Sequence, residues 1–338
     1  MHHPTPRSPC TRSCVLRGAA ALLLGLALPV LHAQSRPAAD YPTHPVRIIV
    51  PFAAGGPADV YARYLAQHLQ AALGQAFIVD DRPGAGSIIG TDAVAKSAAD
   101  GYTLLLMSNT HTVNETLVPN KPYQLLRDFQ PVAPINSSDL VLVTRPGLGV
   151  PTVAALIERA KAKPGALTYA SSGQGTPYHM AGELFKAMAG VSILHIPYKG
   201  SSGARTDVLA GQVDMMFDAV PSMSEHIRSG KVQALATTGA QRSPVLGDVP
   251  TVSEAGVAGY EAVIWLGLMA PRGTPDAIVQ RLNDEVARIV SAPEAQRQWP
   301  AQGATPMVMN VERFTRFVGE DIVKWAEIVK RSGAKPEQ

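Results

Sequence analysis

Two patterns of apolar residues alternate along most of the chain. Residues 46–73 show both: a β-branched run ends at Pro51, and a stretch with apolar residues four positions apart begins at Pro57. The first pattern is typical of a buried parallel strand and the second of an amphipathic helix. Gly56 can cap this helix, and Gly74 can end it.

The same patterns predict further elements along the chain. Strands are expected at residues 76–79, 102–107, 140–144, 167–170, 193–196, 213–217, 232–236 and 263–269. Helices are expected at residues 153–163, 178–189, 204–210, 275–290 and 311–329. Alternating strands and helices with short connections predict an α/β fold with mainly parallel sheets flanked by helices.

A second strand, turn and helix unit at residues 167–189 resembles the first unit and suggests two facing halves. The chain can cross between the halves at residues 145–147 and 237–239. We therefore expect one discontinuous domain of residues 41–143 plus 239–338, and a second domain of residues 144–238. Strand order cannot be read from one sequence.

The first 33 residues have the features of a secretory signal peptide. Arginines precede an apolar run at residues 19–30, and Ala33 is a small residue suited to cleavage before Gln34. Cys10 and Cys14 lie ahead of the run, so cleavage removes both, and the mature chain is expected to have no disulfide. No later stretch approaches the about 20 apolar residues that span a bilayer, so we expect a soluble periplasmic protein.

Charge and composition limit the kinds of partner that the chain is expected to bind. The chain has 30 Lys and Arg against 27 Asp and Glu, and three of the arginines precede Ala33, so the mature protein is close to neutral. Without a basic stripe, nucleic acid is not an expected partner. With 338 residues and 46% hydrophobic content, the chain can bury a large core.

Two polar turns each precede a predicted helix. The first is almost free of side chains, and the second is rich in hydroxyl groups, so both can direct backbone N–H groups at an anion. For the second turn, an ordinary Ser/Thr-rich cap with a glycine turn is the alternative. The candidate ligand residues here are Phe52, Ala54, Gly55 and Gly56 in the first turn, and Ser171, Ser172, Gly173 and Thr176 in the second.

Further candidates follow the predicted strands, where ligands of open α/β sheets collect. Ser108 and Asn109 can contact a ligand or cap the next helix, and Asp218 can accept from a ligand or serve as a cap. Tyr198 can form part of the wall of a ligand cleft. Asp59 lies in the first turn of its helix, where a carboxylate is also favoured by the helix dipole alone.

Metal, dinucleotide and catalytic sites have little support. No pair of histidines has metal-ligand spacing, and Gly173 and Gly175 lack the third glycine of a dinucleotide fingerprint. A triad of Ser172, His179 and Asp218 can be imagined, but the chain has no G-x-S-x-G elbow. We therefore expect no catalytic residues, metal or cofactor.

An ordered set of motifs resembles one family. The motifs are VRIIVPFAAGGPADVYAR, DDRPGAGSIIGTDAVAKSAADGYTLL, YASSGQGTPYHMAGELF, HIPYKGSSGARTDVLAGQVD, VPTVSEAG and APRGTP. They are similar to those of the Bug receptors, the extracytoplasmic solute-binding proteins of the tripartite tricarboxylate transporter (TctC-like) family. The resemblance covers residues 41–333.

The resemblance implies a type II periplasmic binding fold, with a ligand held between two domains that close like a Venus flytrap. It implies a small carboxylate as ligand, held by backbone N–H groups, hydroxyls and water, and membrane permease subunits as partners of a monomer. Ala54 stands where the family often has proline. His111 matches no fixed residue of the family and is a candidate for selecting the ligand's distal group.

Other functions for the same fold stay open. In a signalling receptor, the closed form would bind a sensor protein instead of a permease. A serine hydrolase would instead hydrolyse a carboxylate ester. The sequence does not identify the carboxylate.

Overall fold

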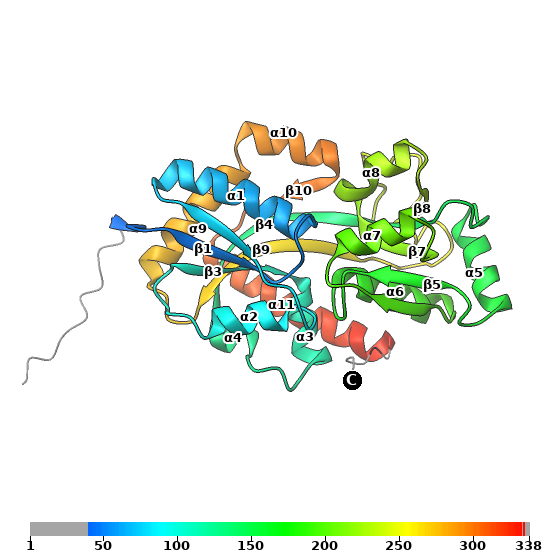
Figure 1. The fold of residues 1–338 in the computed structure, drawn as a ribbon, viewed down its shortest axis with the longest axis horizontal. Helices are drawn as coiled ribbons and strands as arrows, with labels where there is room; N and C mark the ends of the chain where they lie inside the picture. The colour runs from blue at the N-terminus through cyan, green and yellow to red at the C-terminus, as the bar shows by residue number, and fades with distance from the viewer. Residues whose placement is uncertain (1–39, 333, 335–338) are drawn as a thin grey trace, which may run out of the picture. The chain divides into compact units, whose positions relative to one another are not determined.

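Strands and helices alternate as the apolar pattern predicts in the computed structural model, which describes residues 40–332 and 334 (Figure 1). The strands are β1 (Val46–Val50), β2 (Phe77–Asp81), β3 (Thr103–Ser108), β4 (Phe129–Thr144), β5 (Thr168–Ser171), β6 (Leu194–Pro197), β7 (Met215–Ala219), β8 (Gln233–Thr237), β9 (Val263–Pro271) and β10 (Ala304–Pro306). The helices are α1 (Pro57–Leu73), α2 (Ile88–Ala95), α3 (Asn109–Leu117), α4 (Leu125–Asp128), α5 (Val153–Ala162), α6 (Pro177–Ala189), α7 (Ser201–Leu209), α8 (Val220–Arg228), α9 (Asp276–Val290), α10 (Pro293–Gln302) and α11 (Val311–Ser332). The expected signal peptide lies outside the described residues.

The first strand, turn and helix unit forms as expected. Strand β1 pairs in parallel with β2 and β3. Helix α1 begins at Pro57 after the cap residue Gly56, and it buries Tyr61, Leu65 and Leu69. The helix ends at Gly74, whose φ of 72° is the left-handed conformation that glycine adopts without strain.

The strands run in the order β2-β1-β3-β9-β4-β7-β5-β6, with β10 and β8 also pairing with β4. The outer pairs β1–β2, β1–β3, β5–β6 and β5–β7 are parallel. Strand β9 is antiparallel to β3 and β4, and β4 is antiparallel to β7 and β8. The two-domain α/β architecture is thus confirmed, with antiparallel strands where its two parallel parts meet.

Strand β4 is longer than the pattern predicts, because it begins at Phe129 instead of Leu140. Prolines at positions 131 and 134 interrupt the apolar pattern of its first half. In the structure the pairing of β4 with β9 shifts register next to each of these prolines. Proline is tolerated in a sheet at such irregular positions, since its missing N–H breaks no regular pairing there.

Strand β4 takes part in both halves of the sheet. Asp139 pairs with Val263 of β9, whereas the next residue, Leu140, pairs with Ala219 of β7. The pairing changes back between the end of β8 at Thr237 and the start of β9. The domain limits expected from the sequence, 41–143 plus 239–338 and 144–238, stay a prediction.

Separate apolar clusters cover the two halves, and α11 joins them. Residues from α1, α9 and β1 pack on the first half, and residues from α5, α6 and β7 pack on the second. A further cluster contains Val113 and Leu117 of α3, Met180 of α6, and Trp325 of α11. Helix α11 therefore packs against a helix of each half. Among the described residues, none of the helices combines the length and apolar character needed to cross a membrane.

Candidate ligand-binding site

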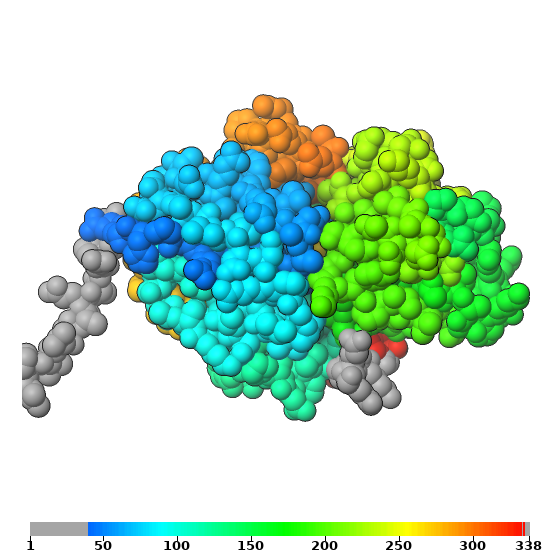
Figure 2. Space-filling view, in the orientation of Figure 1, coloured from blue at the N-terminus to red at the C-terminus, as the bar shows by residue number. Residues whose placement is uncertain are grey.

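The turn between β1 and α1 touches the turn between β6 and α7. The backbone N–H of Ala53 donates to the carbonyl of Lys199 at 3.3 Å, and Ser202 Oγ donates to the carbonyl of Ala54 at 3.1 Å. We call this contact between residues 53–56 and 199–202 the seam. The space-filling view shows the blue first turn in direct contact with the green second half (Figure 2).

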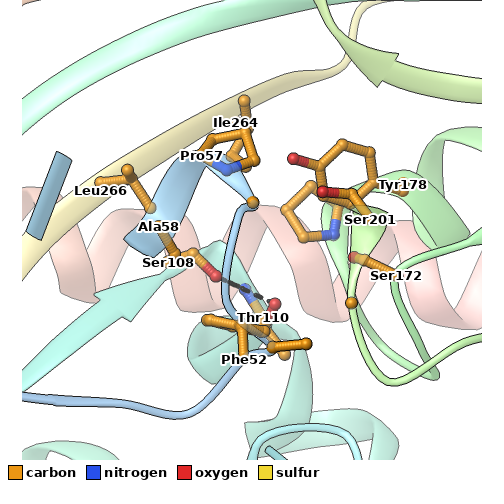
Figure 3. A pocket seen from close by; sticks show the side chains of 14 residues that line it. Phe52, Pro57, Ala58, Ser108, Thr110, Ser172, Tyr178, Ser201, Ile264 and Leu266 are labelled. Atoms are coloured by element: carbon orange, nitrogen blue, oxygen red, sulfur yellow. Dashed lines mark hydrogen bonds between the residues drawn. The ribbon is translucent and has the colours of Figure 1, made fainter. Parts of the chain in front are cut away.

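A cavity lies beside the seam (Figure 3). Its lining is mostly apolar, with a few hydroxyl groups and with no charged side chain among the described residues that form it. The lining residues are Phe52, Ala53, Gly56, Pro57, Ala58, Ser108, Thr110, Ser172, Pro177, Tyr178, Gly200, Ser201, Ile264 and Leu266. Figure 3 shows Phe52, Ser108 and Thr110 on one side and Ser172, Tyr178 and Ser201 on the other.

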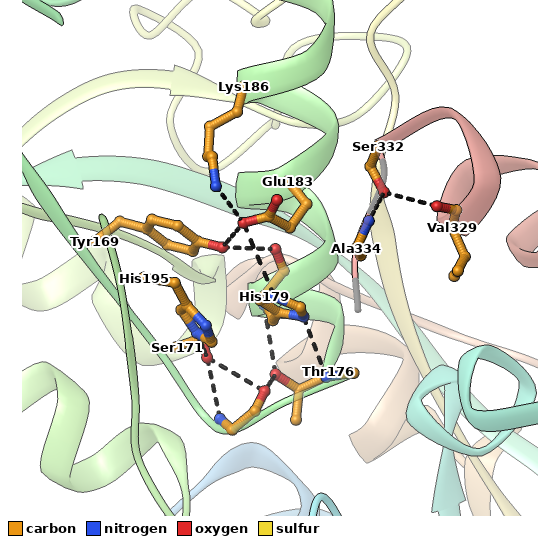
Figure 4. A network of polar contacts seen from close by, with 12 residues as sticks. Tyr169, Ser171, Thr176, His179, Glu183, Lys186, His195, Val329, Ser332 and Ala334 are labelled. Carbon is orange, nitrogen blue, oxygen red and sulfur yellow. Dashed lines mark hydrogen bonds and ion pairs between the residues drawn. The ribbon is translucent and has the colours of Figure 1, made fainter. Parts of the chain in front are cut away.

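Ser172 differs from the other hydroxyl residues of its turn. Ser171 Oγ accepts the N–H of Gly173 and lies 2.6 Å from His195 Nε2, while Thr176 Oγ1 donates to the carbonyl of Gly173 at 2.7 Å (Figure 4). Ser172 is only 6% exposed, and its Oγ has no hydrogen-bond partner among the described residues. An unpaired buried hydroxyl is costly, so this oxygen is available to a ligand.

Helix α6 begins directly behind Ser172. Pro177, which has no N–H, is its first residue, and the His179 N–H donates to Oγ1 of the cap residue Thr176, so in the first turn the Tyr178 N–H is left without an acceptor among the described residues. Gly173 has a φ of 123°, and a Cβ there would lie 2.8 Å from the carbonyl oxygen of Tyr198. Glycine is therefore required for the close approach of these two turns.

Ser108 lines the cavity from the first half, where it caps α3. Its Oγ accepts the N–H of Thr110 at 3.2 Å and donates to Thr110 Oγ1 at 2.9 Å. The next residue of the helix, His111, accepts the Ser108 N–H on Nδ1 at 3.2 Å. The Ser108 hydroxyl is thus fixed in place by its own helix.

His111 lies outside the linings of both cavities described here. Its Nε2 lies 3.0 Å from Thr91 Oγ1, and the Thr91 hydroxyl donates to the carbonyl of Ser87 at 2.8 Å. Its Nδ1 also lies 3.0 Å from the carbonyl oxygen of Ser108, and burial lowers the pKa of the ring to about 4. Both nitrogens are engaged with the protein, so the geometry does not support His111 as a direct selector of the ligand's distal group.

Three sequence candidates are held by other residues and lie outside the cavity linings. Asp59 accepts the N–H of Gly55 at 2.9 Å and pairs with Arg63. Asn109 Nδ2 donates to the carbonyl of Val263 at 2.9 Å. Asp218 is completely buried, and Arg205 Nε donates to it at 2.8 Å. These three side chains therefore hold neighbouring parts of the protein in place and do not line the cavities.

The imagined catalytic triad is not assembled. His179 Nδ1 accepts the N–H of Gly175 at 3.1 Å, Asp218 pairs with Arg205, and Ser172 Oγ has no protein partner among the described residues. Burial lowers the pKa of His179 to about 3, which makes it a poor base. The part of the chain that the structure describes also contains no group of three or more side chains placed to hold a metal ion.

A second cavity adjoins the first. It shares Phe52 and Ser172 with the first cavity. The remaining lining residues are Pro51, Gly84, Ala85, Gly86, Ser87, Gly173, Gln174, Thr176, Pro197, Tyr198 and Lys199. Tyr198 therefore lies at this cavity, with its hydroxyl donating to Asp207.

The predicted site residues divide into those at the cavities and those behind them. Phe52, Gly56, Ser108, Ser172, Gly173, Thr176 and Tyr198 line one or both cavities, whereas Ala54, Gly55, Asp59, Asn109, Ser171 and Asp218 do not. Sequence reasoning missed Tyr178, Ser201, Ile264 and Leu266. Ser201 follows a strand and opens a helix, which is the signal used for Ser108. Ile264 and Leu266 are two positions apart in a buried strand, where the sequence does not show which side faces a cleft.

Comparison with known proteins identifies the family. The profile described as tripartite tricarboxylate transporter family receptor (TctC) matches residues 61–334. The chain belongs to this family. Protein BugT of Bordetella pertussis is 41% identical over 327 residues, which cover 96% of this chain and 98% of BugT.

Solved structures of TctC receptors have the same fold. Rpa4515 of R. palustris, solved with adipate, is 36% identical with a TM-score of 0.85, covering 88% of this chain and 100% of the other. MatC (Rpa3494) of Rhodopseudomonas palustris, solved with bound malate, is 30% identical with a TM-score of 0.82, covering 86% of this chain and 100% of the other. The resemblance inferred from the motifs is thereby confirmed.

Proposed function

We propose that this TctC receptor captures a small carboxylated organic solute in the periplasm and delivers it to the membrane subunits of a tripartite tricarboxylate transporter. The observation that carries the proposal is the buried Ser172 Oγ, which has no protein partner among the described residues and lines both cavities. The first turn of α6 follows it with the N–H of Tyr178 and the positive end of the helix dipole. Adipate and malate in two related structures support a carboxylate.

The solute is bound by neutral donors in this proposal. Hydroxyl and backbone N–H groups replace the water around a carboxylate without a buried countercharge, which would itself be costly to desolvate. The apolar residues Pro57, Ile264 and Leu266 enclose the body of the solute in the first cavity. Such a site is expected to bind without chemical change to the ligand.

Closure of the two halves around the solute is the second part of the proposal. The seam brings Gly56 so close to Ser201 that a Cβ at Gly56 would lie 3.1 Å from Ser201 Oγ. A Cβ at Gly175 would lie 2.6 Å from Asn114 Oδ1 of the first half. A solute that contacts the turns of both halves binds the closed form more tightly than the open form, and it therefore favours the closed form. In this proposal the receptor is a monomer, and the membrane partner recognises its closed form. Export follows from a signal peptide cleaved near Ala33.

Thermal unfolding of the periplasmic protein with a panel of mono-, di- and tricarboxylates, acidic amino acids and aromatic acids tests the proposal. A solute at about 100 times its dissociation constant adds roughly 2.7 kcal/mol to the free energy of unfolding. Ser172→Ala is expected to weaken binding by about 10- to 100-fold, since hydrogen bonds to charged groups contribute about 1.5–3 kcal/mol.

Ser291→Ala, at the end of α9, is the matched control, and its affinity should equal that of the wild type. Chromatography of the solute after incubation should recover it unchanged. Consumption of the solute would indicate an enzyme, and the absence of any shift across the panel would refute carboxylate binding.

A further inference from the structure

We propose that His179 and His195 are positioning residues for solute binding, because their rings hold the turn that presents the Ser172 hydroxyl to the cavities. This inference rests on the proposed function and adds two residues that line neither cavity. His179 belongs to α6, which follows the turn, and His195 belongs to β6, which pairs with the strand before the turn. The turn is therefore held by two separate elements of the second half.

Each ring is attached to a different part of the turn. His179 Nδ1 accepts the N–H of Gly175 at 3.1 Å. His195 Nε2 lies 2.6 Å from Ser171 Oγ, and the same Oγ accepts the N–H of Gly173 at 3.1 Å. The N–H groups of both glycines are thus engaged with the protein, so they restrain the turn and are not donors to a solute.

Ser172 lies between the two residues of the second attachment, Ser171 and Gly173. Its own Oγ has no hydrogen-bond partner among the described residues, so no protein group fixes the hydroxyl directly. Its position therefore depends on the restrained backbone of its neighbours. A binding group keeps its geometry only where the surrounding residues hold its segment in place. Loss of either ring is expected to displace the hydroxyl.

The two rings are themselves part of a packed stack. The ring centroids of His179 and His195 are 4.2 Å apart, and His195 stacks on Tyr169 at 4.8 Å (Figure 4). The Tyr169 hydroxyl donates to Glu183 Oε1 at 2.5 Å, and Lys186 Nζ donates to the same oxygen at 2.7 Å. A buried polar network whose members are all satisfied is rigid. The stack therefore gives the turn a fixed base.

Both rings keep an acceptor nitrogen near neutral pH. Burial lowers the pKa of each ring to about 3, so the neutral form predominates. Because His179 accepts on Nδ1, its proton is on Nε2, which lies 3.9 Å from Glu183 Oε1. Nitrogen-15 spectra of the wild type should show this tautomer. A proton on Nδ1 of His179 would overturn the attachment to Gly175.

Titration calorimetry tests the role of His179 in binding, with the acid of the carboxylate panel that gives the largest thermal shift. His179→Leu removes the acceptor and should weaken binding of this acid about tenfold, since a buried N–H is left unpaired and the turn shifts. Asparagine carries its amide oxygen on Cγ, as histidine carries Nδ1. His179→Asn should therefore stay within about threefold of the wild-type affinity.

The same comparison at His195 uses glutamine, because the glutamine amide lies one carbon farther from the backbone and reaches the position of Nε2. His195→Leu should weaken binding about tenfold, and His195→Gln should stay within about threefold of the wild type. Thermal unfolding of each variant without solute shows that it is folded at the temperature of the titration.

A double-mutant cycle distinguishes positioning from a general structural effect. In Ser172→Ala the hydroxyl that the rings position is absent, so adding His179→Leu should weaken binding by less than about threefold. A ring that only stabilises the fold would cost the same factor in both backgrounds. His68→Leu on α1 is the matched control. The half-buried His68 ring lines neither cavity, and its Nδ1 lies 2.9 Å from the carbonyl of Tyr64 in its own helix.

Each outcome decides the inference. Restoration of affinity by His179→Asn and a smaller effect in the Ser172→Ala background would support it. Wild-type affinity in His179→Leu and His195→Leu, or equal losses in both backgrounds, would overturn it and leave the carboxylate receptor intact. If His179→Leu does not fold, His179→Gln replaces it, and equal affinity of the Gln and Asn variants would overturn the inference. Failure of every acid to bind the wild type would refute the proposed function and this inference with it.

Discussion

Gly200 offers a direct test of closure, because a methyl group there collides with the other half of the molecule. Its φ of 175° is extended backbone that alanine adopts without strain. An added Cβ would lie 2.7 Å from the Cβ of Ala53 and 3.2 Å from its backbone nitrogen. Carbon atoms pack best at about 3.5–4.0 Å, so Gly200→Ala is expected to disfavour the arrangement in which the two turns touch.

The size of the effect follows from the cost of overpacking. Inserting a methyl group into a tight contact costs about 1–3 kcal/mol. If the solute binds the closed form, this cost appears as a loss of affinity of about 5- to 150-fold. The ligand-free protein can relieve the collision by opening, so its thermal midpoint should stay within about a degree of the wild type.

Titration calorimetry for the solute and thermal unfolding of the ligand-free protein measure the two quantities. Gly247→Ala is the matched control, since no atom lies within 4 Å of its added Cβ. The double variant Ala53→Gly with Gly200→Ala should recover most of the affinity, because it removes the carbon that the new methyl meets. No recovery would mean that the methyl blocks the solute directly. Unchanged affinity in Gly200→Ala alone would refute closure at the seam.

Three further predictions concern buried polar groups. His111→Leu removes the acceptor of the Ser108 N–H and should lower the free energy of unfolding by about 2–4 kcal/mol in urea titrations, whereas a fall below 0.5 kcal/mol would contradict its capping role. Burial lowers the pKa of His111 to about 4 and of His179 to about 3, so the folded state resists protonation of both rings. The stability that the neutral histidines contribute is complete above pH 6.5 and falls as the pH is lowered toward 3, by up to about 1.4 kcal/mol per pH unit for each histidine. A urea midpoint that does not change between pH 6.5 and pH 4 would refute this prediction. Burial raises the pKa of Asp321 to about 6, so the contribution of its protonated form to the free energy of unfolding is complete below pH 3.8 and is lost as the pH rises through 6. Asp321→Asn should abolish this loss of about 3 kcal/mol. Urea midpoints that fall equally with pH in the wild type and the variant would contradict the prediction.

The local units were predictable from the sequence because their signals are local. Pro57 and Gly74 bound α1 as the capping rules require. The turns at Gly56 and Ser172 reach the cavities because each follows the end of a parallel strand, where such folds place their ligands. These inferences need only the order of residues within one unit.

Features that depend on pairing between distant segments were not predictable. Asp218 follows a strand as Ser108 does, but the buried Arg205 pairs with it and removes it from the cavity. Ile264 and Leu266 lie on one face of β9, and that face lines the cavity once β9 is paired with the distant strands β3 and β4. Neither the partner of a buried carboxylate nor the direction of a strand is encoded in its immediate neighbours.

The path of β4 has a consequence for how this protein folds. One continuous strand of 16 residues pairs with β9 and β10 along its first part and with β7 and β8 along its second. Neither half can complete its sheet until this segment is in place, so we expect the two halves to share a single folding unit. We therefore expect calorimetric unfolding to be one cooperative transition, and we expect the amides of β4 to be among the slowest in the molecule to exchange with solvent deuterium.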